Sequence, residues 1–253
     1  MSMLYVVGTP IGNLNDMSYR AIETLKSVDF IAAEDTRVTV KLLNHFEIKK
    51  PMVSYYEHNL RERGEFIVAR ILAGETCAIV SDAGMPCISD PGEDLVRICA
   101  AQNIDIKVIP GPTAVISGLA LSGLKTSRFT FEGFLSISRA SRMAHLKEIK
   151  TETRTMIFYE APHKLKQTLR DLYETLGDRK ISIARELTKI YEEVNRTTLK
   201  EAVPFYSGTL PRGEFVLVIE GKEIEKPTEI TLEDAIIMAQ KLLDDGVKKT
   251  DAA

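Results

Sequence analysis

Short apolar runs alternate with longer amphipathic stretches along most of the chain. The runs are four or five residues long and rich in Val, Ile, Leu and Phe, as buried β-strands are. They lie at residues 4–7, 30–33, 77–80, 106–109, 155–159, 181–184 and 215–219. Between them, apolar residues recur at steps of three and four, as in Ile67, Ile71 and Leu72. This spacing predicts helices at residues 19–28, 39–46, 62–72, 94–101, 142–149 and 165–176. Strands that alternate with helices predict an α/β fold built from βα units.

The character of the loops changes near residues 113–124. Before this point the loops are rich in Gly and Pro, and after it the chain becomes basic. We therefore expect an N-terminal α/β domain at residues 1–115 and a C-terminal α/β domain at residues 116–222. Residues 223–253 are expected to form a linker and an incomplete helical appendage.

Composition places the chain among ordinary globular proteins. It has 253 residues, of which 44% are hydrophobic and 27% charged, enough for a sizeable core. The longest apolar runs are about six residues, far short of the ~20 that cross a bilayer. The first residues have no basic segment or cleavage pattern of a secretory signal, so we expect a cytoplasmic protein without a membrane anchor.

Cysteine and histidine spacing argues against a metal site. The three cysteines form no CxxC pair, and the four histidines show no HxxxH or HExxH pattern. The net charge of −3 is distributed unevenly, because residues 125–166 hold nine Lys and Arg against four Glu. This basic stretch could face a polyanion, although a solvated helix face would explain it equally well.

Three loops rich in Gly and Pro each follow an apolar run directly, at residues 8–14, 81–92 and 110–114. In an open α/β sheet, the loops at the carboxyl ends of the strands line the ligand crevice, and Gly allows the backbone to approach a ligand closely. The chain contains neither GxxxxGK[ST] nor GxGxxG, the patterns that bind phosphate chains. The loops therefore favour a nucleoside-like cofactor without a phosphate chain.

Polar clusters end three further strands, at residues 34–37, 158–164 and 184–189. Each admits two interpretations. The polar side chains could act on a substrate, or Asp35 and Glu160 could cap the helices that follow and residues 184–189 could form a salt-bridged turn. The residues alone do not decide between the two.

Taken together and in order, these segments resemble the ribosomal RNA small subunit methyltransferase I family of the tetrapyrrole-methylase superfamily. The resemblance covers residues 4–221 and rests on residues 8–14, 33–37, 81–92, 110–114, 158–164, 184–189 and 213–221. It implies two α/β domains with S-adenosylmethionine in the cleft between them, and a homodimer. It also implies methylation of a cytidine ribose 2′-oxygen in the decoding region of small-subunit ribosomal RNA, as free RNA or in a 30S-type particle.

The resemblance carries a cofactor site to particular positions of this chain. In the first half, the implied contacts are Pro10, Asp82, Gly84, Met85, Thr113 and Ala114. In the second half, they lie at or near Tyr159, Leu187 and Gly213.

Methyl transfer to a ribose hydroxyl gains from a proton acceptor. The candidates are Lys189, provided that burial lowers its pKa, Glu186 and His163. The nucleotide could be oriented by Arg37 on a phosphate and by Glu34 or Asp35 on the cytidine amino group. A further substrate contact is Lys164, at a position where relatives commonly have Arg.

Two other functions remain open. A methyltransferase for a tetrapyrrole or corrin precursor would need a cleft for a macrocycle with many carboxylates, which the basic stretch could also serve. A non-catalytic RNA-binding assembly factor would bind the cofactor without turnover. Methyl transfer to ribosomal subunits distinguishes the RNA enzyme from both.

Overall fold

The computed structural model describes residues 2–223, 236–237, 240–241 and 243–246. Its contacts divide the chain into two units, Met1–Lys222 and Glu223–Ala253. The first unit contains two β-sheets. Whether these sheets are separate domains with the predicted bounds 1–115 and 116–222 stays a prediction. The appendage predicted for residues 223–253 lies largely outside the described residues.

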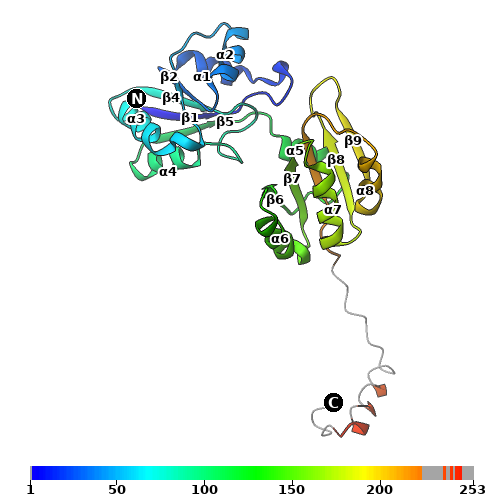
Figure 1. Ribbon diagram of the computed structural model, residues 1–253. Helices are drawn as coiled ribbons and strands as arrows, with labels where there is room; N and C mark the ends of the chain where they lie inside the picture. Colours follow the sequence, from blue (N-terminus) through cyan, green and yellow to red (C-terminus); the bar gives the residue numbers. More distant parts are fainter. Residues whose placement is uncertain (1, 224–235, 238–239, 242, 247–253) are drawn as a thin grey trace. The chain divides into compact units, whose positions relative to one another are not determined.

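The first sheet has five parallel strands in the order β3-β2-β4-β1-β5 (Figure 1). The strands are β1 (Met3–Val7), β2 (Phe30–Ala33), β3 (Met52–Ser54), β4 (Thr76–Val80) and β5 (Asp105–Ile109). The connecting helices are α1 (Tyr19–Ser27), α2 (Thr36–His45), α3 (Leu60–Leu72) and α4 (Glu93–Ala101), with short 3-10 helices at Leu14–Asp16 and Glu57–Asn59.

The central strands of this sheet are buried on both faces, because they are apolar at nearly every position. In β2, Phe30 and Ala32 belong to the core under α3 and α4, whereas Ile31 and Ala33 belong to the core under α1 and α2. Continuous apolar runs of this kind are characteristic of parallel strands covered on both sides. Alternate side chains along each strand point to opposite faces of the sheet, so each strand contributes to both cores.

The second sheet is mixed, in the order β6-β7-β10-β8-β9. The pair β6 and β7 is parallel, and the other neighbours are antiparallel. The strands are β6 (Phe129–Phe134), β7 (Thr155–Glu160), β8 (Lys180–Arg185), β9 (Glu193–Thr198) and β10 (Phe215–Ile219). The helices are α5 (Ala114–Leu121), α6 (Arg139–Glu148), α7 (Leu165–Leu176) and α8 (Leu199–Ser207), with a 3-10 turn at Ile149–Thr151.

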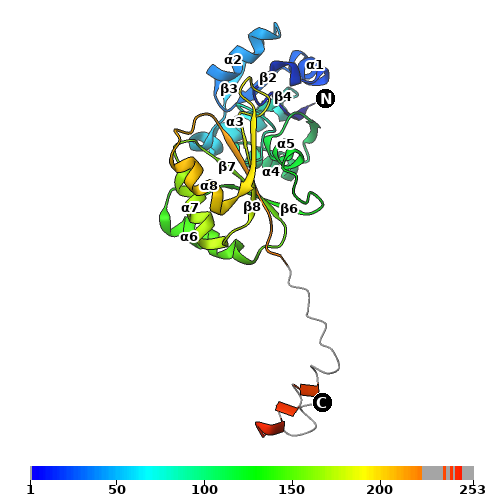
Figure 2. The same ribbon diagram turned by 90° about the vertical axis from the view of Figure 1, so that its right-hand side faces the viewer.

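The second sheet lies between α5 on one face and α6, α7 and α8 on the other (Figure 2). Alternate residues of β10 again separate the two cores, with Leu217 under α7 and α8 and Val216 under α5. Gly118 allows α5 to pack closely, because a Cβ there would lie 2.8 Å from Val216 Cγ1. The helix that follows the last strand of the first sheet is thus packed on the second.

All seven predicted strands and all six predicted helices are present, with ends shifted by at most three residues. The helix predicted from Thr39 begins earlier, at Thr36, because Asp35 caps its N-terminus. The helix predicted from Arg142 begins at Arg139. Five strands and α-helices have no predicted counterpart: β3, β6, β9, α5 and α8.

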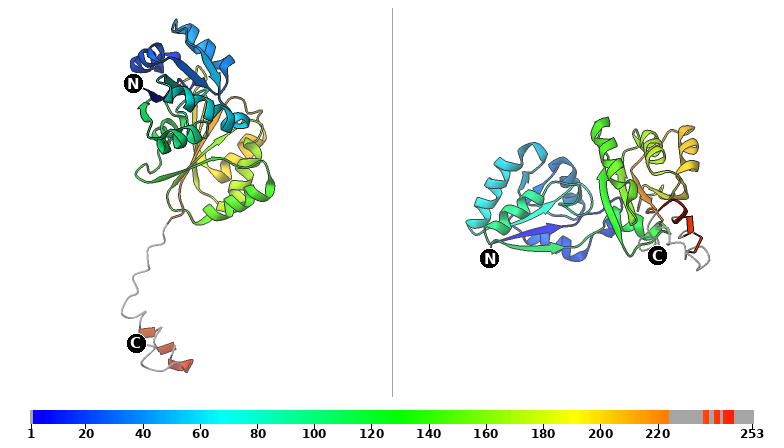
Figure 3. Two further views of the ribbon diagram at one scale, coloured as in Figure 1. Left: turned by 90° about the vertical axis from the view of Figure 1, so that its left-hand side faces the viewer. Right: turned by 90° about the horizontal axis from the view of Figure 1, so that it is seen from below.

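The three Gly and Pro loops of the first sheet meet where β1, β4 and β5 end. The backbones of Thr9 and Gly84 exchange two hydrogen bonds, of 2.8 and 3.1 Å, and Gly8 N donates to Ile109 O at 3.0 Å. A Cβ on Gly8 would lie 2.7 Å from Gly111 Cα, so only glycine allows the first and third loops to pack this closely. The strands of the first sheet run toward the second sheet, so the loops face it (Figure 3).

Candidate functional site

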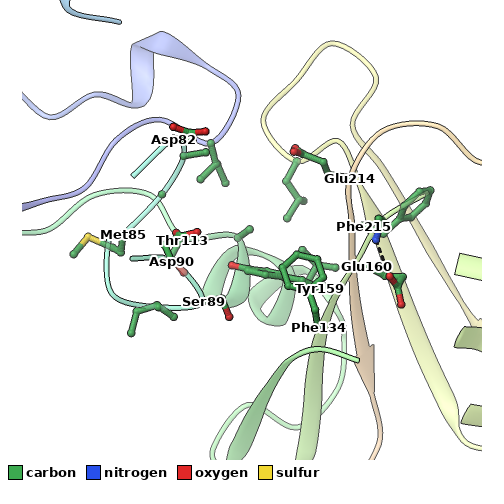
Figure 4. A pocket seen from close by; sticks show the side chains of 18 of the residues that line it. Asp82, Met85, Ser89, Asp90, Thr113, Phe134, Tyr159, Glu160, Glu214 and Phe215 are labelled. Atoms are coloured by element: carbon green, nitrogen blue, oxygen red, sulfur yellow. Dashed lines mark hydrogen bonds between the residues drawn. The ribbon is translucent and has the colours of Figure 1, made fainter. Parts of the chain in front are cut away.

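A cavity of about 580 Å³ lies between the loops of the two sheets. This volume is within the range of small-molecule sites. Figure 4 shows Asp82, Met85, Asp90 and Thr113 of the first half on one side and residues of the second half on the other. All three loops of the first half contribute lining residues, as do the end of β7 and the start of β10. The predicted convergence of the loops on one pocket is confirmed.

Most of the residues predicted to contact the cofactor line this cavity. They are Asp82, Gly84, Met85, Thr113, Ala114, Tyr159 and Leu187. Pro10 and Gly213 do not line it themselves, but each is adjacent in sequence to a lining residue, Ile11 and Glu214 respectively. Of the remaining candidates, only Glu34 and His163 line the cavity. Lys189, Glu186, Asp35, Arg37 and Lys164 lie outside its lining.

Three carboxyl groups make one end of the cavity acidic: Glu34, Asp82 and Asp90. Two of them fasten the ends of β2 and β4 together, because Glu34 Oε2 accepts a 3.3 Å hydrogen bond from Asp82 N and Asp82 Oδ1 accepts one of 3.1 Å from Asp35 N. Burial, and then repulsion among the acids, raises the pKa of all three, that of Asp90 to about 6. Asp90 is not among the predicted site residues, although the loop that contains it, residues 81–92, was predicted to line a ligand site.

Asp35 and Arg37 form a local pair at the start of α2. Asp35 Oδ1 accepts a 2.8 Å hydrogen bond from Arg37 N as the helix cap, and Asp35 Oδ2 is 2.6 Å from the Arg37 guanidinium. The hydrogen bonds from the Arg37 side chain and then its backbone lower the pKa of Asp35 to about 2. The capping interpretation of Asp35 is therefore confirmed. The Arg37 side chain is 88% exposed.

Lys189 bridges two carboxylates in the loop between β8 and β9. Its Nζ lies 2.8 Å from Glu186 Oε1 and 2.8 Å from Glu214 Oε2. Burial by itself lowers the pKa of Lys189, but the hydrogen bonds to Glu186 and Glu214 outweigh burial and leave the pKa above its ordinary value. The condition on which Lys189 could accept a proton, a lowered pKa, is therefore not met, and Lys189 is an ammonium ion at neutral pH.

Glu186 is a carboxylate held on two sides. The hydrogen bond from Lys189 lowers its pKa most, and Glu186 Oε1 also accepts from Glu214 N at 3.0 Å. Gly213 leaves space for this side chain, since a Cβ there would lie 2.5 Å from Glu186 Cγ. Glu186 and Thr188 both have positive φ, 51° and 67°, a strained conformation that tertiary contacts must maintain. The salt-bridged turn is confirmed, and it fixes the loop that carries Leu187 into the cavity.

Glu160, at the end of β7, is 3% exposed. Its carboxylate accepts hydrogen bonds from Thr168 Oγ1 in α7 and from Ala161 N. These bonds attach the strand to the helix that follows it. His163 lies between them on the same connection, where its side chain is exposed at the cavity wall.

An aromatic wall forms part of the side of the cavity that the second sheet contributes. The Tyr159 ring contacts Phe131 and Phe134, with ring centroids 5.0 and 5.5 Å apart respectively. Burial raises the pKa of Tyr159 to about 12, so its hydroxyl stays neutral. Phe134, Phe215 and Val216 also line the cavity, and the sequence analysis singled out none of them. A glycine directly before an aromatic residue, as in Gly133-Phe134, was the available signal for a strand irregularity.

The described residues were also compared with the requirements of a metal site and of a membrane-spanning helix. In the part of the chain that the structure describes, no group of three or more His, Cys, Asp or Glu side chains is placed to hold a metal ion. Across the same residues, every helix is too short or too polar to span a membrane.

Comparison with known proteins shows the family. Residues 3–203 match the family described as tetrapyrrole (corrin/porphyrin) methylases. The chain is 48% identical to "Ribosomal RNA small subunit methyltransferase I" of Synechocystis sp. over 100% of its own length and 91% of the relative's. It is 47% identical to the protein of that name from Thermotoga maritima, over 88% of its own length and 100% of the relative's.

The fold also resembles a solved cobalt precorrin-4 methyltransferase of cobalamin biosynthesis. The TM-score is 0.62 at 16% identity, and the match covers 86% of this chain and 94% of the other. At this identity the likeness concerns the fold alone. The chain therefore belongs to the tetrapyrrole methylase family and, within it, to the ribosomal RNA small subunit methyltransferase I proteins.

Proposed function

We propose that this protein transfers a methyl group from S-adenosylmethionine to the 2′-oxygen of a cytidine ribose in the decoding region of small-subunit ribosomal RNA. The observation that supports it most is one cavity, lined from both sheets, with carboxyl groups from the first half and aromatic side chains from the second. The names of the relatives, at 47–48% identity, supply the RNA as the substrate class. The precise nucleotide and oxygen are taken from the resemblance in sequence motifs.

The residues of the cavity fit S-adenosylmethionine. Its sulfonium and ammonium groups are cationic, and Glu34, Asp82 and Asp90 supply carboxylates at one end. Its single carboxylate would find the N-terminus of α5, where the Thr113 side chain makes no capping hydrogen bond and Ala114 begins the helix. The cavity volume of about 580 Å³ is ample for such a ligand.

When bound, S-adenosylmethionine supplies an electrophilic methyl group on a positively charged sulfur. The protein then has to align the ribose oxygen with that group, and positioning of this kind supplies roughly 7–11 kcal/mol. Met85, Ala114 and Leu187 give the cavity an apolar lining that excludes water around the reacting groups. The turn formed by Glu186 and Lys189 holds Leu187 in place.

Of the three proposed proton acceptors, His163 fits best. It lines the cavity, whereas Lys189 is held as an ammonium ion and Glu186 is occupied by Lys189 and the Glu214 backbone. We expect His163→Gln to lower kcat of methyl transfer roughly 10²–10⁴-fold, the usual contribution of a general base. Affinity for S-adenosylmethionine, measured by calorimetry, should not change. An unchanged kcat would show that a group other than His163 accepts the proton.

The RNA contacts proposed for Arg37, Asp35 and Lys164 lie outside the cavity lining, where a bound strand would extend. Arg37 already carries Asp35 as a partner, so a phosphate would share its guanidinium. Glu34, inside the cavity, remains the candidate for the cytidine amino group. A homodimer and a cytoplasmic location stay predictions of the resemblance.

The proposed function is tested by mapping 2′-O-methyl groups on ribosomal RNA from cells with and without this protein. A cytidine mark in the decoding region that disappears with the gene, and returns with the purified protein and S-adenosylmethionine, is the expected result. Radiolabelled transfer to a porphyrinogen instead of to small ribosomal subunits would establish the tetrapyrrole alternative. Binding of both ligands without transfer would establish the assembly factor.

A further inference from the structure

The end of β6 is irregular where it reaches the cavity. Phe131 pairs with Ile157, but Gly133 pairs with Phe158 and Phe134 with Tyr159, so the register shifts between Phe131 and Gly133. Gly133 has a φ of +65°, which glycine adopts without strain. This is a β-bulge with one additional residue in β6.

The bulge determines which way Phe134 faces. Residues three apart in a regular strand lie on opposite faces of the sheet. Because the bulge adds one residue, Phe131 and Phe134 lie on the same face, and the Tyr159 ring contacts both. Phe131 packs in the core beneath α5, whereas Phe134 lines the cavity (Figure 4).

Phe134 is fixed in place although it is exposed. Its side chain is 54% exposed, and the next residue, Leu135, is buried in the core on the opposite face. The Leu135 anchor and the Tyr159 contact leave Phe134 little freedom to turn. A rigid, half-exposed aromatic ring on a cavity wall is the usual surface on which proteins stack an unpaired nucleic-acid base.

We propose that Phe134 stacks on the base of the nucleotide whose ribose is methylated, an assignment that rests on the proposed function. An enzyme that acts on a folded RNA must take the target nucleotide out of its stack and compensate for the lost base contacts. Phe134 provides that compensation from the second half of the chain, and Glu34, Asp82 and Asp90 hold the cationic cofactor from the first half. The chain continues from Phe134 to the exposed Arg139 at the start of α6, where the flanking phosphates can bind.

The adenine of S-adenosylmethionine is the other aromatic base that could occupy this surface. Exposure favours the RNA base, because a nucleotide enters from solvent and Phe134 is the exposed member of the aromatic wall. Tyr159, which is less exposed, is left for the cofactor. The two sources are separated by measuring cofactor affinity and RNA kinetics on the same variants.

The experiment compares Phe134→Leu, which removes the ring, with Phe134→Tyr, which keeps it. Phe205→Leu is the matched control, because Phe205 is 55% exposed on α8 and does not line the cavity. Each variant is assayed with purified small ribosomal subunits that lack the methyl group, at saturating S-adenosylmethionine. Cofactor affinity is measured by calorimetry without RNA, and thermal unfolding verifies that each variant is folded.

We expect Phe134→Leu to raise KM for the subunits about tenfold or more, the effect of losing one stacked base, with the affinity for S-adenosylmethionine unchanged. Phe134→Tyr and Phe205→Leu should keep the wild-type KM. Weakened cofactor binding in Phe134→Leu would assign the ring to adenine and overturn the proposal, as would unchanged values of both constants. Failure of the wild-type protein to methylate the subunits would instead overturn the proposed function, and the stacking role with it.

Discussion

At the scale of single residues, the charge of the cavity depends on the protonation of its carboxyl groups. Asp90 has the most strongly shifted of them, with a pKa raised to about 6 by burial and by the nearby charges of Glu34 and Asp82. It is thus mostly neutral at pH 5 and mostly ionised at pH 7. A cationic ligand interacts favourably with the ionised form only.

The affinity for S-adenosylmethionine should therefore increase as the pH rises from 5 to 7. If binding needs the Asp90 carboxylate, the change approaches roughly tenfold, because the ionised fraction rises from about one tenth to about nine tenths. The α-amino group of the ligand stays charged over this range. Calorimetric titrations at several pH values measure the effect.

Asp90→Asn is the control for this pH dependence. The variant should bind S-adenosylmethionine more weakly at pH 7 and lose most of the dependence between pH 5 and 7. S-adenosylhomocysteine, which lacks the sulfonium charge, should respond less to the substitution. An equally steep pH dependence in Asp90→Asn would show that another group controls the charge of the site.

At the scale of the elements, the loops on either side of the cavity rely on glycines at positions of close approach. Gly213, just before β10, has a φ of +86°, and its missing Cβ leaves room for Glu186. Gly177, after α7, also has positive φ, 78°, but a Cβ at this position would have no neighbour within 4 Å. Comparing alanine substitutions at Gly213 and Gly177 therefore separates the cost of backbone strain from the cost of steric contact.

Gly177→Ala should destabilise the protein by about 1–3 kcal/mol, the penalty for an L-residue in a backbone conformation (φ 78°, ψ −166°) that essentially only glycine adopts. Gly213→Ala should destabilise the protein by about 2–6 kcal/mol, because crowding against Glu186 adds about 1–3 kcal/mol to a backbone strain of about 1–3 kcal/mol. The free energy of unfolding from denaturant titration provides the comparison. Equal losses would mean that the Glu186 side chain moves away without penalty.

Strong amphipathic or apolar patterns made most elements predictable, and the missed ones lack such a pattern. Helix α5 is apolar all round, so no polar face reveals its period, and α8 contains Pro204. Strand β9 is a polar edge strand, Glu193–Thr198, and β3 has three residues. In β6 the bulge at Gly133 breaks the alternation. Local propensity carries little information where tertiary contacts define the element.

The candidate site was predictable in its loops and less so in its individual side chains. Glycine and proline at strand ends indicated where the chain would bend, and the residues beside those bends do line the cavity. The raised pKa of Asp90 and the contact of the Phe134 ring with Tyr159 depend on segments that are distant in sequence. The same holds in part for Lys189, because the hydrogen bond to Glu214, 25 residues away in sequence, adds to that from Glu186 in raising its pKa. No local pattern records such contacts.

At the scale of the whole molecule, the cavity and the basic stretch at residues 125–166 carry opposite charge. The first half of the chain lines the cavity with the carboxyl groups of Glu34, Asp82 and Asp90, whereas residues 125–166 carry nine Lys and Arg against four Glu. Two of those cations form salt bridges within the protein, since Arg142 pairs with Asp171 and Arg154 with Glu152. Exposed members such as Arg139 and Lys147 on α6 are the ones left for RNA phosphates.

Binding of RNA should therefore weaken as salt rises, because each phosphate contact releases counterions. We expect KM for small ribosomal subunits to increase steeply between 50 and 200 mM salt, a range over which charge-driven nucleic-acid binding changes strongly. Arg139→Glu and Lys147→Glu should each raise KM and reduce the slope of log KM against log salt by about one. Lys26→Glu on α1 makes the same charge change on an exposed residue of the first half and should leave the slope unaltered. If all three variants keep the wild-type slope, α6 does not face the RNA, and the basic stretch is only a solvated surface.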